Sequence, residues 1–187
     1  MIWQRELRSG KDRSDYASLE DFRKIFMEEM DDLYLLALLL TSDEAQAEQS
    51  FVAGLEDSIN SNKVFRDWAH SWAKGTIIKN AIATVRPHPN GAARTKKEFP
   101  TSTDMYAEIV CVLALRDFER FAFVLSVLER YSEMKCSLLL DCSLVDVHDA
   151  RIRAVQQVAA GRTSLLAAHG APRLISTVIE DINEKTN

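Results

Sequence analysis

Residues 131–154 read YSEMKCSLLLDCSLVDVHDARIRA, in which two short apolar stretches are separated by a polar break at residues 141–143. Serine is a preferred helix N-cap, and one stands before each stretch, as Ser132 and as Ser143. Asp146 follows Ser143 by three positions, as in a short relative of the capping box. A three-residue turn is the length that a helix-turn-helix uses. The segment therefore predicts two helices joined by a tight turn, the second being a candidate recognition helix.

The cysteines of this segment offer a different interpretation, a metal or redox site. Cys136, Cys142 and His148 are spaced six residues apart, whereas structural zinc sites place cysteines in pairs two to four residues apart. No fourth ligand lies nearby in the sequence. We expect no metal site, and we expect all three cysteines, including Cys111, to be reduced thiols packed as small apolar groups. A small helical enzyme or metal protein built on the cysteines stays open as an alternative.

Apolar residues recur at helical spacing over the rest of the chain, and strand-like alternation is scarce. Ser18 is an acceptable cap for the first helix, and Ser42 or Asp43 for the second. Gly75 is a weak point within the third helix. The helices expected from the spacing cover residues 18–40, 41–59, 60–85, 104–115, 116–131, 132–140, 143–160 and 173–182.

A break in this helical pattern spans residues 86–103 (RPHPNGAARTKKEFPTST), which hold three prolines, a glycine and four basic residues. Proline lacks a backbone donor and disfavours helix, so this stretch predicts a linker. We therefore expect an all-α protein of two small helical domains joined by a flexible linker. The predicted division is 1–84, 85–103, 104–162, and a C-terminal helical extension over 163–187.

The charge balance bears on what the chain can bind. The net charge is −5, yet residues 85–103 carry four Lys or Arg against one Asp or Glu: the basic residues are Arg86, Arg94, Lys96 and Lys97. Proteins bind nucleic acid largely by neutralising phosphates, so the acidic balance of both larger segments argues against strong autonomous DNA binding.

Hydropathy bears on where the protein acts. The longest apolar run, LYLLALLL at residues 33–40, is far shorter than the roughly 20 residues of a membrane-spanning helix. The first residues show no apolar segment of the signal-peptide type. We expect a cytoplasmic protein without membrane contact.

The residues around the predicted helix-turn-helix resemble a known family. Residues 114–154 are similar to region 4 of bacterial sigma-70-type transcription initiation factors of the extracytoplasmic-function class. The matching positions are Leu115, Arg120, Phe123, Val124, Leu125, Tyr131, Ser132, Leu139, Leu140, Cys142, Ser143, Val147, Arg153 and Ala154.

The front half resembles region 2 of the same class. Residues 33–51 (LYLLALLLTSDEAQAEQSF) are similar to its first two helices, including the pair Ala47 and Glu48. Residues 65–82 (FRDWAHSWAKGTIIKNAI) resemble its Trp-containing promoter-melting helix. The order of region 2, linker and region 4 covers residues 18–160.

This resemblance implies a sigma factor-like protein that binds the RNA polymerase core and recognises promoter DNA, with an anti-sigma factor as a further partner. Such a protein needs no catalytic residue or cofactor, so we expect no enzyme. The implied DNA-binding residues are Ser143, His148, Arg151 and Arg153 on the recognition helix and Trp68, Trp72, Lys74 and Lys79 in the front domain. The implied polymerase-binding residues are Glu48 and Gln49.

Several positions favour an alternative, a degenerate sigma-like protein-interaction module that has lost promoter binding. Asp146 and Asp149 on the recognition helix repel phosphate. Gln49 replaces an acidic residue of the family, and Gly75 replaces an asparagine. Trp68 and Trp72 lie four residues apart on one helix face, so core packing is an alternative to base stacking for both.

Overall fold

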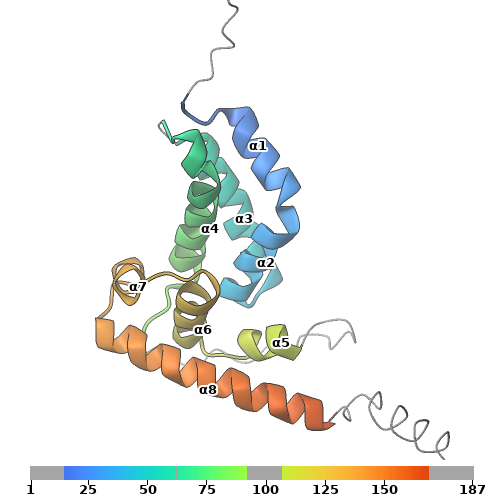
Figure 1. Cartoon of the computed structure of the whole chain (residues 1–187), viewed down its shortest axis with the longest axis vertical. Helices are drawn as coiled ribbons and strands as arrows, with labels where there is room; N and C mark the ends of the chain where they lie inside the picture. Colours follow the sequence, from blue (N-terminus) through green and yellow to red (C-terminus); the bar gives the residue numbers. More distant parts are fainter. Residues whose placement is uncertain (1–14, 62, 92–106, 169–187) are drawn as a thin grey trace, which may run out of the picture.

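The computed structural model describes residues 15–61, 63–91 and 107–168, and these residues form helices and no β-strand (Figure 1). The all-α prediction is confirmed for this part of the chain. The helices are α1 (Leu19–Glu28), α2 (Met30–Thr41), α3 (Glu44–Ile59), η1 (Arg66–Trp68), α4 (Ala69–Val85), α5 (Ala107–Leu113), α6 (Asp117–Phe123), the π-helical turn η2 (Val124–Leu128), α7 (Glu133–Leu140) and α8 (Leu144–Ala168).

Short polar side chains cap these helices where the sequence predicts it. Ser18 forms a capping box with Asp21, and Asp43 accepts a hydrogen bond from the Gln46 amide. Ser132 accepts from the Lys135 amide at 3.2 Å. These bonds satisfy N–H groups that have no partner within their helix.

In the front half, two predicted helices differ from the observed ones. The helix expected over residues 18–40 is interrupted at Glu29, whose φ of −113° and ψ of 24° are not helical. The break lets both parts bury their apolar faces, Phe22 and Phe26 from α1 and Leu33 and Leu36 from α2. The helix expected from residue 60 begins only at η1, after a bridge between Tyr16 and Phe65. Gly75 does not interrupt α4.

Helices α3 and α4 approach each other closely at Gly54. A Cβ atom on Gly54 would lie 2.6 Å from the Ile77 Cγ1 atom and 3.1 Å from the Ile77 backbone. The Gly54 carbonyl accepts hydrogen bonds from the Ser58 and Thr76 hydroxyls at 2.7 and 2.9 Å. Glycine is therefore required here for contact between the two helices.

The helices before and after the predicted linker share one hydrophobic cluster. It joins residues of α2 and α4 to residues of α5, α6, η2, α7 and α8, among them Leu40, Ile78, Phe121, Leu125 and Ala154. In Figure 1, α8 runs along the foot of the molecule beneath α5, α6 and α7. It continues past residue 162, the predicted end of the rear domain. The domain division stays a prediction, and linker residues 92–103 and the helix expected over 173–182 lie outside the described residues.

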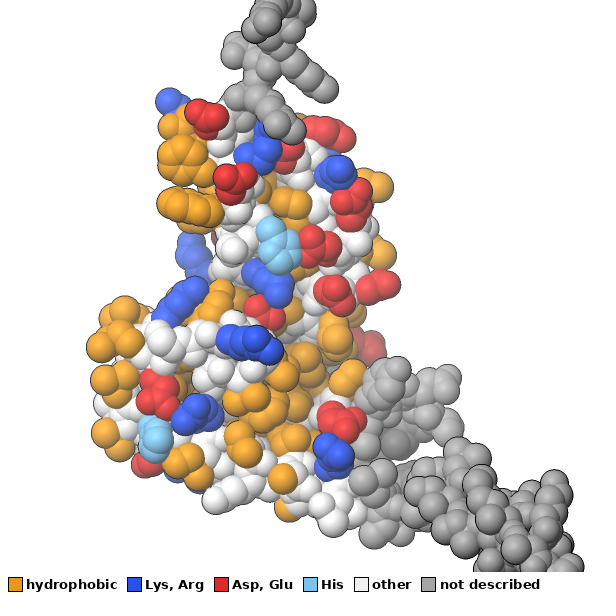
Figure 2. Space-filling model, viewed as in Figure 1, with side chains coloured by type: hydrophobic (Ala, Val, Ile, Leu, Met, Phe, Trp, Pro, Cys, Tyr) orange, Lys and Arg blue, Asp and Glu red, His pale blue; other side chains and the backbone are white. Residues whose placement is uncertain are grey.

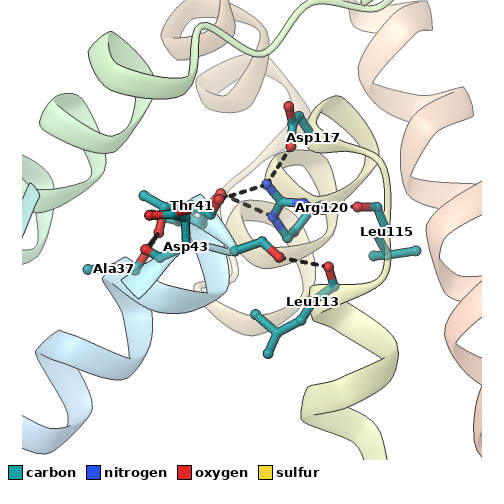
Figure 3. A network of polar contacts seen from close by, with 9 residues as sticks. Ala37, Thr41, Asp43, Leu113, Leu115, Asp117 and Arg120 are labelled. Atoms are coloured by element: carbon teal, nitrogen blue, oxygen red, sulfur yellow. Dashed lines mark hydrogen bonds and ion pairs between the residues drawn. The ribbon is translucent and has the colours of Figure 1, made fainter. Parts of the chain in front are cut away.

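A buried arginine reinforces this junction (Figure 3). Arg120 on α6 is 2% exposed, and its Nε donates to the Leu40 carbonyl at 3.1 Å. Its Nη2 donates to the Thr41 carbonyl at 3.3 Å and to Asp117 Oδ1 at 2.6 Å, and its Nη1 to the Leu115 carbonyl at 2.9 Å. Leu40 and Thr41 end α2, where carbonyls lack intrahelical partners and the helix dipole favours a cation.

Candidate nucleic-acid interface

The two helices predicted on either side of the polar break are present as α7 and α8, joined by residues 141–143. Asp141 ends α7 in the left-handed conformation, with a φ of 49°. The Ser143 hydroxyl accepts from the Asp146 amide at 3.1 Å, so the expected cap of α8 is formed, and the Ser143 amide donates in return to Asp146 Oδ2 at 3.1 Å. Val147, Ala150 and Ala154 are fully buried and form the inward face of α8.

The predicted DNA-contacting side chains of α8 lie on two different sides of the helix. Arg151 and Arg153 are two positions apart, roughly 200° around the helix axis. Arg151 Nη2 lies 3.2 Å from Glu133 Oε1, and His148 Nδ1 lies 3.1 Å from the same oxygen. On the other side, Arg153 Nε donates to Glu119 Oε1 at 2.9 Å. Both arginines remain partly exposed, but each is paired with a carboxylate.

The outward face of α8, between these two sides, is largely uncharged. Val145 is 67% exposed and Ile152 is 41% exposed, and Asp149 is exposed on the same face. The hydrogen bonds from Ser143 hold the pKa of Asp146 below its ordinary value, so this carboxylate is ionised at neutral pH. Figure 2 shows hydrophobic side chains gathered over α7 and the start of α8.

The two tryptophans of the front half are at the surface. Trp68 is 65% exposed and Trp72 is 44% exposed, so the core-packing interpretation is wrong for both. Phe65 packs edge-on against Trp68 and stacks on Tyr16, with ring centroids 5.4 and 4.9 Å apart. We call Tyr16, Phe65, Trp68 and Trp72 the aromatic surface; it lies at the N-terminal end of α4, where Figure 2 shows hydrophobic side chains.

The remaining predicted site residues are dispersed over the front helices. Lys74 is half-buried and donates to Glu129 Oε2 of the rear half at 3.1 Å, so it lies at the junction. Lys79 is exposed further along α4. Glu48 and Gln49 are both exposed on α3, where a partner protein can reach them. The structure does not bring these residues together with those of α8 into one site.

The structure brings together cationic residues that the sequence interpretation did not group. Arg86, His88, Arg116 and Arg153 line a pocket of about 170 Å³ with the acidic residue Glu119. Glu119 is 1% exposed and accepts hydrogen bonds from Arg116 Nε at 3.0 Å, from Arg116 Nη2, and from Arg153 Nε.

No sequence signal points to this pocket, because its residues come from the start of the predicted linker, α6 and α8. Burial disfavours ionisation of Glu119, but the hydrogen bonds from Arg116 and Arg153 outweigh it and hold its pKa below the ordinary value. Glu119 is therefore a carboxylate at neutral pH.

The cysteines behave as packing groups in this structure. Cys136 is fully buried in the shared hydrophobic cluster, which confirms its predicted role. Burial raises the pKa of its thiol to about 11, and burial also raises the pKa of the half-buried Cys142. Within residues 15–61, 63–91 and 107–168, no three His, Cys, Asp or Glu side chains are grouped to hold a metal ion.

Comparison of the chain with protein-family models, curated proteins and solved structures finds no match. Among the described helices, none is long and apolar enough to cross a membrane. An inference about function therefore starts from the resemblance of the sequence motifs and from the geometry of α4, α7 and α8.

Proposed function

We propose that the chain is a sigma factor-like transcription initiation protein that binds the RNA polymerase core in the cytoplasm and contacts promoter DNA through α7 and α8. The observation that supports the proposal most directly is the pair of capped helices α7 and α8, joined by residues 141–143. α8 buries Val147, Ala150 and Ala154 and leaves the opposite side open, as a helix entering the major groove requires. His148, Arg151 and Arg153 flank that open side.

The front half supports the same function through the aromatic surface. Exposed aromatic rings stack on unpaired bases, and this stacking contributes about 1–3 kcal/mol per base. Lys63 lies over the Tyr16 ring, with its Nζ 5.7 Å from the ring centroid, and provides a cation for the phosphate backbone. An opened promoter strand is the ligand that fits such a surface.

Two proteins are the proposed partners. The exposed side chains of Glu48 and Gln49 on α3 are the proposed contact with the polymerase core. An anti-sigma factor is the second proposed partner.

The test is capture of core polymerase by the purified full chain, followed by run-off transcription from genomic DNA fragments. We expect capture at low salt and specific transcripts. Absence of any polymerase binding would rule the proposal out. Glu48→Lys should weaken capture, and Glu56→Lys, at an exposed position on the same helix, is the matched control.

A second candidate function is a sigma-like interaction module that no longer binds promoters. The observation that favours it is the outward face of α8, where Val145 and Ile152 are exposed beside Asp149. Arg151 and Arg153 are already paired with carboxylates. Polymerase capture without binding to any promoter duplex, even at low salt, would select this candidate over the first.

A further inference from the structure

Three separate parts of the chain line the pocket beside Arg153. Its residues include Arg86 and His88 after α4, Arg116 and Glu119 at the start of α6, and Arg153 on α8. Its volume is about 170 Å³. The function proposed above uses only Arg153 of this set.

The charges on the residues that line the pocket do not cancel. Three guanidinium groups line the pocket with two carboxylates, those of Glu119 and Asp117. The Asp146 carboxylate, outside the lining, interacts electrostatically with His88 and Arg153. Asp117 Oδ1 accepts a hydrogen bond from the buried Arg120 at 2.6 Å, so this carboxylate also serves a further cation. The lining therefore carries an excess of positive charge.

The guanidinium groups retain donors for a ligand. Arg153 donates to Glu119 through Nε, and its Nη groups make no hydrogen bond to the described residues. Arg116 uses Nε and one Nη on the same carboxylate, which leaves its other Nη. A guanidinium carries five N–H donors in a planar fork that matches phosphate oxygens.

The surrounding structure holds these donors in place before any ligand arrives. Glu119 is buried behind Arg116 and Arg153 and orients both. Arg86 is the C-cap of α4, and a hydrogen bond from its amide to the Ile82 carbonyl at 2.8 Å fixes its backbone beside the pocket. Such preorganisation lowers the entropy cost of binding.

The imidazole adds a further donor. His88 Nδ1 accepts from the Asn90 amide at 3.2 Å, so the neutral ring carries its proton on Nε2.

We propose that this pocket binds a phosphate group. Phosphate suits a pocket of this size because several forked cations converge on it, and a tetrahedral oxyanion accepts from more than one of them at once. The phosphate comes either from a DNA backbone or from a small phosphorylated molecule. Binding of a DNA phosphate rests on the proposed function, because Arg153 also belongs to the proposed recognition helix. Binding of a small phosphorylated molecule does not depend on that function.

The first experiment titrates the full chain with inorganic phosphate and with pyrophosphate at low ionic strength, using calorimetry. We expect saturable binding by the wild type and at least ten-fold weaker binding by Arg86→Gln, since Arg86 forms no ion pair with a described residue. Arg23→Gln, at an exposed position on α1, is the matched control and should bind as the wild type. Thermal unfolding of both variants checks that the fold is intact.

The second experiment separates the two sources by measuring the salt dependence of binding to a duplex of random sequence. If the phosphate belongs to DNA, Arg86→Gln should lower the slope of log K against log salt by about one. An unchanged slope, with phosphate binding lost in the same variant, assigns the pocket to a small phosphorylated molecule.

Absence of saturable binding to phosphate or pyrophosphate, together with an unchanged DNA slope, overturns the proposal. Equal weakening by Arg86→Gln and Arg23→Gln also overturns it. Polymerase capture is measured with the same variants. If the chain captures polymerase but binds no phosphate, the phosphate proposal is refuted and the sigma-like function is not. If the chain binds phosphate in the pocket but captures no polymerase, the sigma-like function is refuted and the phosphate proposal is not.

Discussion

Arg120 Nε donates to the main-chain carbonyl of Leu40 at 3.1 Å, although the two residues are 80 positions apart in the sequence. A side chain of α6 thereby donates a hydrogen bond to a main-chain carbonyl at the C-terminal end of α2. The bond joins the parts of the chain that precede and follow the predicted linker, beside the hydrophobic cluster that they share. The front and rear halves are therefore expected to unfold together.

Removal of this arginine should destabilise the whole protein. Arg120→Ala removes the buried donor that serves the carbonyls of Leu40, Thr41 and Leu115 and the carboxylate of Asp117. We expect a loss of about 3 kcal/mol in the free energy of unfolding, measured by urea denaturation. Arg23→Ala, on the exposed side of α1, should change stability by less than about 0.5 kcal/mol. A similar small effect for Arg120→Ala would contradict the role of the junction.

Two glycine-to-alanine substitutions should have opposite effects. At Gly54 the added Cβ meets Ile77 at 2.6 Å, so Gly54→Ala should cost about 1–3 kcal/mol as α3 and α4 are pushed apart. At Gly75 the added Cβ meets nothing within 4 Å, so Gly75→Ala should stabilise α4 by about 0.5–1 kcal/mol. The denaturation midpoints of the two variants show whether each substitution raises or lowers the stability. A change in the same direction for both variants would refute the packing described for α3 and α4.

Acid should weaken the fold through Glu119. Because its pKa in the folded protein lies below its ordinary value of 4.5, Glu119 contributes stability that is present above that value. This contribution is lost as the pH falls through the folded pKa. Glu119→Gln should therefore be less stable than the wild type at about pH 7, and the gap should narrow in acid. Thermal unfolding across that range measures it, and a constant gap would contradict the assignment.

The buried thiols should react slowly with thiol reagents. Burial raises the pKa of Cys136 to about 11 and also raises that of Cys111, so little thiolate forms at neutral pH. We expect both cysteines to react with a chromogenic disulfide at the rate of unfolding, and faster in urea. Cys136→Ser and Cys111→Ser identify which thiol is observed. Rapid reaction of Cys136 in the folded protein would contradict its burial and would favour the alternative of a redox site at the cysteines.

The aromatic surface should bind single-stranded DNA. Trp68→Ala removes a ring that is 65% exposed, so it should weaken binding to a fluorescent oligonucleotide by about 1–3 kcal/mol with little effect on stability. Trp72→Ala should act in the same direction. Met27→Ala, at an exposed apolar position on α1, is the control and should leave binding unchanged. If both tryptophan variants bind the oligonucleotide as tightly as the wild type, the aromatic surface does not bind single-stranded DNA.

Local chemistry is readable from the sequence alone. The caps at Ser18, Asp43, Ser132 and Ser143 occur where the sequence predicts them, because each involves a side chain and an amide only three residues apart. The inward face of α8 was predictable for a related reason: the helical repeat places Val147, Ala150 and Ala154 on one side whatever surrounds the helix.

Features that depend on distant partners appear only in the tertiary structure. Spacing placed Trp68 and Trp72 on one face but could not tell whether a neighbouring helix covers it; none of the described helices buries them. The break at Glu29 carries no glycine or proline signal, and follows from packing on both sides of it. Likewise, Arg86, Arg116 and Arg153 converge because α4, α6 and α8 pack around a shared core, an arrangement set by contacts between residues far apart in the chain.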